Sequence, residues 1–244
     1  MVSLTSAVLG WVRLKSGQAS KTVSFVLGIV SCVSITMALG VRGELRGACP
    51  LMDAGEVFLF IAWSLSLVYV LTGGTYRVSL LGLFSAPMVA LFLGLVLVPG
   101  MLSENPVRAE HLDPWKESHA ATSVLSFGAL GLGALAAFMF LVLDTRLKAQ
   151  KAGWVSMKMP PVNTLVQSVD RLLLLGVVVL SLGIAAGFVT TIESGLSHLI
   201  TAGGVWIAYV ALLVWYKWQG MPPKLFARIT VGLFLLSCLL FFII

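Results

Sequence analysis

The composition of this 244-residue sequence excludes an ordinary water-soluble domain. Hydrophobic residues make up 59% of the chain and charged residues 11%, with a mean hydropathy of +1.01, whereas a soluble globular domain carries about 25% charged residues. The net charge is +6, which favours contact with anionic lipid headgroups. The basic residues are not interleaved with aromatic residues as they are in a nucleic-acid groove. We therefore expect a single polytopic membrane domain with membrane lipid, and no nucleic acid, as a partner.

The first 21 residues (MVSLTSAVLGWVRLKSGQASK) combine a short apolar run with basic residues that follow it. A secretory signal peptide has the opposite order, with its basic residues first. This order predicts an N-terminal surface segment over residues 1–21 that leads into an uncleaved first span. The remaining residues, 22–244, are expected to form the membrane domain.

Seven apolar runs with few or no charges follow, each close to the roughly 20 residues that a helix needs to cross a bilayer core of about 30 Å. They cover residues 22–40, 56–72, 78–98, 119–143, 171–189, 199–216 and 225–244. A backbone in hydrocarbon must satisfy its own hydrogen bonds, and these runs lack the alternation of a barrel strand. The predicted fold is therefore all-α, a polytopic transmembrane helix bundle of about seven spans.

The segments between these runs differ in charge, and Lys and Arg concentrate on the cytoplasmic side of membrane proteins. With the N-terminus inside, the inner segments hold twelve of the 16 basic residues: Arg13, Lys15, Lys21, Arg77, Arg146, Lys148, Lys151, Lys158, Arg171, Lys217, Lys224 and Arg228. The outer segments hold Arg42, Arg46, Arg108 and Lys116. The asymmetry predicts a chain with its N-terminus inside and its C-terminus outside.

All three histidines, His111, His119 and His198, fall on the outer side in this orientation. Asp113 and Pro114 form a helix-start signal, with Asp as the cap and Pro at the first helical position, which places His119 about one turn into its helix. His198 opens the sixth span. Two imidazoles at the outer ends of neighbouring spans suit the axial positions of a haem iron, although an interfacial histidine also needs no more than a wet surface for its polar tip.

Other chemistry finds no support in the motifs. No HxxxH or His/Asp/Glu cluster offers three or four ligands to a metal other than haem iron, and neither GxSxG nor HExxH occurs. We therefore expect His119 and His198 as the metal ligands, no catalytic residue and no enzymatic activity.

Three segments carry a resemblance to a known family. They are ACPLMDAGEVFLFIAWSLSLVYV at 48–70, HAATSVLSFGALGLGALAAFMFLVLDTRLK at 119–148 and HLITAGGVWIAYVALLVWYKWQG at 198–220, followed by a last span RITVGLFLLSCLLFFII. The first matches at Pro50, Leu51, Glu56, Phe60 and Trp63, the second at its opening histidine, and the third at Trp206 and Tyr209. Over roughly residues 45–244, their order and spacing resemble the cytochrome c assembly protein family in its CcsA/HemX-like branch.

The resemblance implies a haem-handling or accessory protein of c-type cytochrome assembly in the bacterial cytoplasmic (inner) membrane. It implies haem as the cofactor, held by His119, His198, Glu56 and Trp206, with apocytochrome c and a second assembly subunit as partners. Haem exporters of this family carry a Trp-rich WWD loop between outer histidines, whereas residues 190–197 (TTIESGLS) contain no Trp. The chain is therefore closer to the HemX-like branch, and any export-type activity is expected to need a partner subunit.

Two other functions stay open at this point. One is a structural or regulatory membrane subunit without haem of its own, and the other is a subunit of a small-molecule transporter. Two of the candidate residues also have simpler roles. Glu56 begins a span, where a carboxylate stabilises a helix N-terminus, and Trp206 lies deep enough to serve in core packing.

Overall fold

A computed structural model of the chain describes residues 21–75, 81–108, 113–148, 162–190 and 196–243. Within these residues the chain forms seven helices and no strand: α2 (Lys21–Arg46), α3 (Ala54–Thr75), α4 (Leu81–Val96), α5 (Pro114–Lys148), α7 (Val162–Thr190), α8 (Leu196–Gln219) and α9 (Pro223–Ile243). Each helix falls on one predicted span, which confirms the all-α fold. The predicted surface segment 1–21 lies almost wholly outside the described residues and stays a prediction.

Six of the helices are long and apolar enough to cross a membrane, as judged by length and composition. The exception is α4, which has 16 residues and therefore spans about 24 Å at a rise of about 1.5 Å per residue, less than a bilayer core of about 30 Å. The chain is thus a multi-pass membrane protein with six clear spans and one shorter apolar helix. That outcome agrees with the expectation of about seven.

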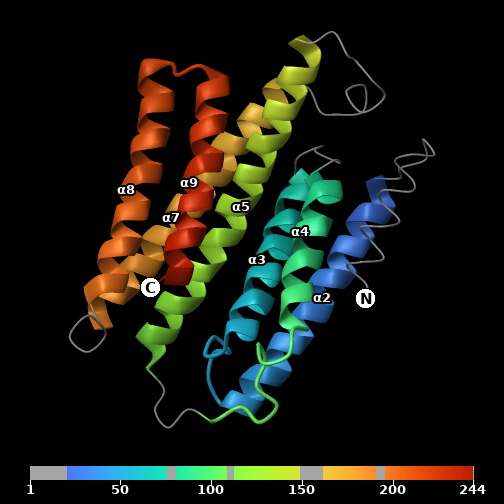
Figure 1. Cartoon of the computed structure of the whole chain (residues 1–244), viewed down its shortest axis with the longest axis vertical. Helices are drawn as coiled ribbons and strands as arrows, with labels where there is room; N and C mark the ends of the chain where they lie inside the picture. The colour runs from blue at the N-terminus through green and yellow to red at the C-terminus, as the bar shows by residue number, and fades with distance from the viewer. Residues whose placement is uncertain (1–20, 76–80, 109–112, 149–161, 191–195, 244) are drawn as a thin grey trace.

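Successive helices run in opposite directions, as Figure 1 shows. The ends of α2, α4 and α7 and the starts of α3, α5 and α8 consequently lie at one end of the bundle, the lower end of the figure. This end, where α5 and α8 begin, is called the His119 end below. The alternation brings the starts of the helices that contain His119 and His198 to one end, as the sequence predicted.

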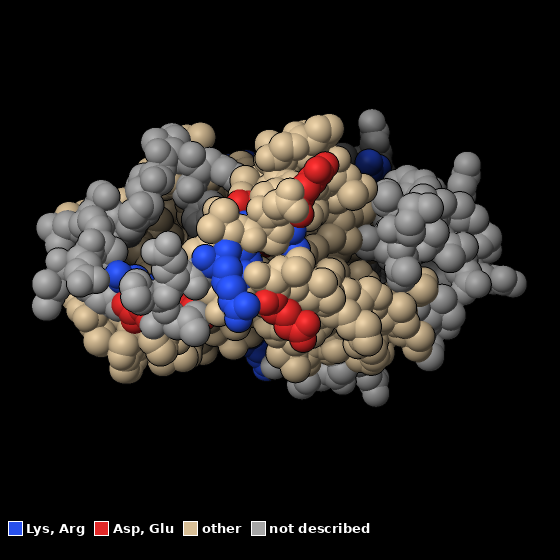
Figure 2. Space-filling model, turned by 90° about the horizontal axis from the view of Figure 1, so that it is seen from below, with Lys and Arg blue, Asp and Glu red and all other residues tan. Residues whose placement is uncertain are grey.

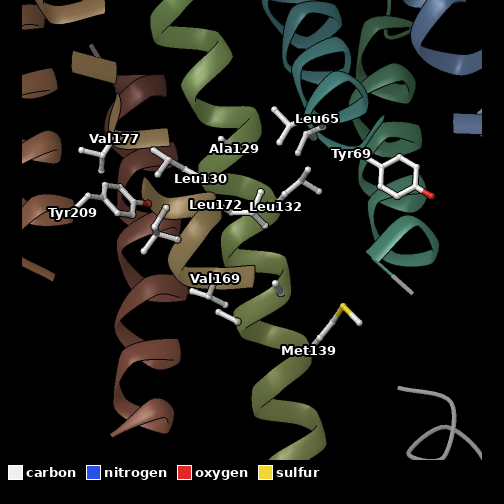
Figure 3. Packing of buried hydrophobic residues seen from close by; sticks show 14 of the residues in the cluster. Leu65, Tyr69, Ala129, Leu130, Leu132, Met139, Val169, Leu172, Val177 and Tyr209 are labelled. Atoms are coloured by element: carbon white, nitrogen blue, oxygen red, sulfur yellow. The ribbon is translucent and has the colours of Figure 1, made fainter. Parts of the chain in front are cut away.

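Helix α5 is the centre of the bundle. It contacts α3 and α4 on one side and α7 and α9 on the other, whereas α8 contacts only α7 and α9 among the described elements. Figure 3 shows the core around α5, with Leu65 and Tyr69 of α3 to one side and Leu172 and Val177 of α7 to the other. The described helices therefore form two groups of three, α2–α4 and α7–α9, held together by α5 (Figure 1).

Small residues allow α5 to approach both groups closely. A Cβ added to Gly128 would lie 2.6 Å from the carbonyl carbon of Ser64 in α3, and one added to Gly133 would lie 2.6 Å from Leu173 Cδ1 in α7. Ala129 and Ala137 are almost completely buried. The small residues of α5 thus form a packing surface, as expected where helices associate in lipid.

Candidate haem-ligand site at the start of α5

The start of α5 sets the height of His119 in the bundle. Asp113 Oδ1 accepts hydrogen bonds from the backbone N–H groups of Trp115 at 3.0 Å and Lys116 at 3.4 Å. Pro114 occupies the first helical position, where its missing N–H costs nothing. The predicted helix start is therefore confirmed, and His119 lies in the second turn of the helix.

The His119 ring is half-buried against α7, where its Nδ1 lies 2.7 Å from the carbonyl oxygen of Gly183. A carbonyl oxygen only accepts hydrogen bonds, so Nδ1 must carry the proton that is donated to it. The other nitrogen of a neutral ring, Nε2, then holds a lone pair. Histidines that bind metals almost always have this arrangement, with the second ring N–H donated to a carbonyl or carboxylate.

His119 forms part of the wall of a cavity of about 260 Å³. Four helices, α5, α7, α8 and α9, supply its lining: His119, Ser123, Ser126, Phe127, Leu130, Leu180, Thr201, Ala202, Val205, Ser237 and Leu240. Most of this lining is apolar. Ser123 adds a buried hydroxyl with no hydrogen-bond partner among the described residues.

His198 belongs to the first turn of α8, at the same end of the bundle as His119. Its side chain lies outside what the structure describes. Position 198 precedes Thr201 and Ala202 by three and four residues, and residues at this spacing share a helix face. Because Thr201 and Ala202 line the cavity, position 198 lies on the cavity face of α8. His111 lies outside the described residues.

Glu56 is fully buried, and its carboxylate serves α2 and the start of α3. Oε1 accepts hydrogen bonds from Nε of Arg42 at 3.0 Å and from Nε of Arg46 at 2.9 Å. Oε2 accepts from the backbone N–H groups of Met52 at 3.1 Å and Asp53 at 3.2 Å. The bond back to Asp53, three residues earlier, is a capping-box contact, so Glu56 does act at a helix N-terminus. Both of its oxygens are occupied there, whereas the partner of His119 is the Gly183 carbonyl.

Trp206 lies in α8 and joins it to α7. Its indole Nε1 donates a hydrogen bond to Ser181 Oγ at 2.8 Å, and the side chain is half-buried. The α8 residues that line the cavity are Thr201, Ala202 and Val205. Trp206 therefore supports the wall next to Val205 by fixing α8 against α7.

Sequence reasoning missed the buried ion cluster to which Glu56 belongs. The side chains of Arg42 and Arg46 both pair with Asp53 as well as Glu56. Asp53 Oδ2 also accepts the backbone N–H of Ser103 at 3.1 Å and its hydroxyl at 2.5 Å. The hydrogen bond from the Ser103 hydroxyl, together with Arg46, lowers the pKa of Asp53 below its usual value.

The cluster clamps the loops at the His119 end. Arg42 Nη1 donates to the Ser103 carbonyl at 2.9 Å and Arg46 Nη1 to the Val107 carbonyl at 3.2 Å, which holds the α4–α5 connection against α2. Figure 2 views this end of the molecule and shows basic and acidic side chains side by side near its middle. Two signals in the sequence pointed to the clamp: Arg residues four apart at the end of α2, and an Asp and a Glu at capping-box spacing.

A further contact connects the clamped loop to α5. Glu117 lies two residues before His119 in the chain, and its Oε2 accepts a hydrogen bond from the backbone N–H of Cys49 at 3.3 Å. Burial raises the pKa of the Cys49 thiol, and the charges of Glu117 and Glu56 add to this effect. The thiol is thus kept neutral and weakly nucleophilic, and the contact serves to fix the first turn of α5.

These features define a class: an all-helical, multi-pass membrane protein with an imidazole presented to an apolar cavity at one end of its bundle. The model of the family described as "Cytochrome C assembly protein" matches residues 51–244. The chain belongs to this family, as its sequence motifs indicated. Its function accordingly lies in the assembly of c-type cytochromes.

Curated relatives agree with the family. The "Cytochrome c biogenesis protein CcsA" of Porphyra purpurea is 25% identical in an alignment that is 279 residues long with its gaps. This alignment covers 93% of this chain and 86% of that protein. The protein of the same name from Prochlorococcus marinus (strain MIT 9301) is 24% identical in an alignment that is 267 residues long with its gaps. This alignment covers 93% of this chain and 82% of that protein. A shorter match, to the CcsA protein of Trichormus variabilis, is 29% identical over 127 residues, or 51% of this chain and 36% of that protein.

Proposed function

We propose that the chain holds haem at the His119 end of its bundle, where His119 would be a ligand of the iron, and passes it on during c-type cytochrome assembly. The observation that carries the proposal is the hydrogen bond of 2.7 Å from His119 Nδ1 to the Gly183 carbonyl, made by a residue in the wall of an apolar cavity. This bond leaves Nε2 as a nitrogen ligand. Bound haem would supply an iron that accepts an imidazole nitrogen as a ligand.

The residues around the cavity fit such a group. Apolar side chains, among them Phe127, Leu130 and Val205, line the cavity and suit the faces of a porphyrin. The Ser123 hydroxyl, which has no described partner, is available to a polar edge. Position 198 on the cavity face of α8 supports His198 as a second ligand. Glu56 and Trp206 act at a distance, since one holds the clamp and the other holds α8 against α7.

The size of the cavity supports a site that a partner completes. Its volume of about 260 Å³ is just below the range of about 300–1,000 Å³ that is usual for small-molecule pockets, and residues 190–197 contain no Trp. A second assembly subunit would then cover the site at the His119 end. We take apocytochrome c to be the acceptor, and we propose a binding and delivery protein with no enzymatic activity of its own.

We also propose that the His119 end faces outward and that the host membrane is the bacterial cytoplasmic membrane. The relatives occur in bacteria and in plastids, so both kinds of membrane are hosts for the family. The excess of basic residues in the segments at the opposite end supports the orientation.

The absorbance spectrum of the purified protein tests the proposal. The chain, prepared from membranes of haem-sufficient cells, should show a Soret band, and His119→Ala should lose or shift that band at unchanged protein yield, because a residue near a helix start contributes few packing contacts. His111→Ala is the matched control, a second histidine predicted on the same side, and should leave the band unchanged. Absence of a Soret band in the wild type, or a normal band in His119→Ala, would show that haem is not held here.

A further inference from the structure

We infer that Gly183 is the positioning residue of this site: its backbone carbonyl selects the tautomer of His119 in which Nε2 is free to bind iron. The hydrogen bond behind this inference is observed in the structure, whereas the binding of iron by Nε2 rests on the proposed function. The Nδ1 atom of His119 and the Gly183 carbonyl oxygen are 2.7 Å apart, within the range of a strong N–H···O bond. The two residues are far apart in the chain and meet because α5 packs against α7.

The carbonyl makes the two tautomers unequal. With the proton on Nδ1, the ring donates to Gly183, and Nε2 carries the lone pair. With the proton on Nε2, the lone pairs of Nδ1 and of the carbonyl oxygen would face each other at 2.7 Å, and the nitrogen available for iron would be protonated. The Nδ1–H form is therefore selected before any ligand arrives, which is the role that carbonyls have beside metal-binding histidines.

A glycine is needed at this position because the two helices are in direct contact there. A Cβ added to Gly183 would lie 2.9 Å from Thr122 Oγ1, 3.0 Å from Ser123 Oγ and 3.2 Å from the Ser123 backbone nitrogen. The Thr122 hydroxyl already donates to the Ser118 carbonyl at 2.5 Å, and the nitrogen of Ser123 is part of the α5 backbone. A methyl group would consequently push α7 away from α5 by several tenths of an ångström and lengthen the bond to His119.

The effect on ligand binding follows from the weakening of this bond. Replacing the hydrogen-bond partner of a metal-binding histidine typically lowers metal affinity by about 10–100-fold. Gly183→Ala, which keeps the carbonyl but moves it away, should therefore weaken haem binding by up to this factor, although residue 183 is not among the cavity-lining residues. Gly133→Ala is the matched control. Gly133 lies at the same helix pair, and its added Cβ would meet Leu173 Cδ1 at 2.6 Å, but it has no part in the His119 bond.

The test that does not depend on haem is the tautomer of His119 in the haem-free protein. Protein labelled with ¹⁵N-histidine is measured by NMR in lipid at alkaline pH, where imidazoles are neutral, and the signals missing from His119→Gln are assigned to His119. The wild type should show a protonated Nδ1 and an unprotonated Nε2. Gly133→Ala should show the same, and Gly183→Ala should show a mixture of both tautomers and the loss in haem affinity.

The outcomes distinguish the inference about Gly183 from the proposed function in haem binding. A protonated Nε2 in wild-type His119, or a Gly183→Ala variant with the wild-type tautomer and affinity, overturns the inference. If Gly183→Ala fails to accumulate, the wild-type tautomer alone decides it. If the haem-free wild type has a protonated Nδ1 but takes up no haem, the proposed function fails while the selection of the tautomer by Gly183 stands.

Discussion

At the scale of single residues, Glu56 best illustrates how packing assigns a role that sequence leaves open. The sequence placed it at a helix start, and the family resemblance gave it a role in holding haem. The structure gives it 0% exposure and two guanidinium partners. Its position before an apolar run predicted the helix start, because capping depends on residues three apart. The charged residues of the clamp are visible in the sequence, but which of them pair depends on how α2 and α3 meet in space, which spacing along the chain does not report.

The buried pairing makes Glu56 critical for stability. Glu56→Ala leaves the partners Arg42 and Arg46, of which Arg46 is 3% exposed, without their main buried carboxylate. Removing one partner of a buried pair typically costs about 3–5 kcal/mol. We expect a loss of this size in the free energy of unfolding in detergent. Glu44→Ala removes an exposed carboxylate from α2, the helix of Arg42 and Arg46. It should change stability little, and equal effects of the two variants would argue against the clamp.

Asp53 should make the stability of the clamp depend on pH. Its pKa is lowered in the folded protein, first by the Ser103 hydroxyl and then by Arg46. A group with a lowered folded pKa stabilises the fold fully above its ordinary pKa of about 3.9 and loses that contribution as pH falls towards the folded pKa. The difference in unfolding free energy between wild type and Asp53→Asn should therefore be constant near neutrality and shrink below about pH 4. A difference independent of pH would contradict this account.

At the scale of helices, hydropathy predicted position and type, but not partners. Each apolar run is close to the length of about 20 residues that a helix needs to cross a bilayer, and each forms a helix. The pair Asp113 and Pro114 marks the start of α5. The short length of α4 and the central place of α5 were not predicted. Hydropathy reports how apolar a segment is, whereas the contacts of α5 with both helix groups depend on small residues such as Gly128 and Gly133, which match the shape of a neighbour.

The contact between α3 and α5 should be sensitive to a single methyl group. An added Cβ at Gly128 would lie 2.6 Å from both the carbonyl carbon and the hydroxyl of Ser64, and overpacking of this kind typically costs about 1–3 kcal/mol. Gly128→Ala should lower the free energy of unfolding by that amount. Gly94→Ala is the control, because its Cβ would meet nothing within 4 Å. An unchanged or raised stability of Gly128→Ala would show that the two helices are less closely packed than described.

At the scale of the whole molecule, the alternation of helices and the distribution of charge act together. The structure brings the starts of α5 and α8 to one end (Figure 1), and the basic asymmetry predicts that this end faces outward. The cavity among α5, α7, α8 and α9 could not be predicted from sequence, because its residues come from four separate spans. Only the histidines at the starts of two of those spans indicated where it would lie.

The orientation is testable with reporter fusions. A reporter that is active in the cytoplasm should be active when it is fused after Lys148, which ends α5, and inactive when it is fused after Glu104, in the α4–α5 connection. The expected difference follows from the excess of Lys and Arg on the inner side. The reverse pattern would place His119 on the cytoplasmic side and remove the argument for delivery of haem to the outside.

The most direct test of the central claim, that His119 binds haem iron, is chemical rescue. His119→Gly removes the imidazole and leaves a space in the cavity wall, which free imidazole in the buffer can fill. The account predicts that the variant loses or shifts the Soret band of the purified protein and that added imidazole restores the wild-type spectrum, with no such response in His111→Gly. A His119→Gly spectrum identical to that of the wild type, or an altered spectrum that imidazole leaves unchanged, would contradict it.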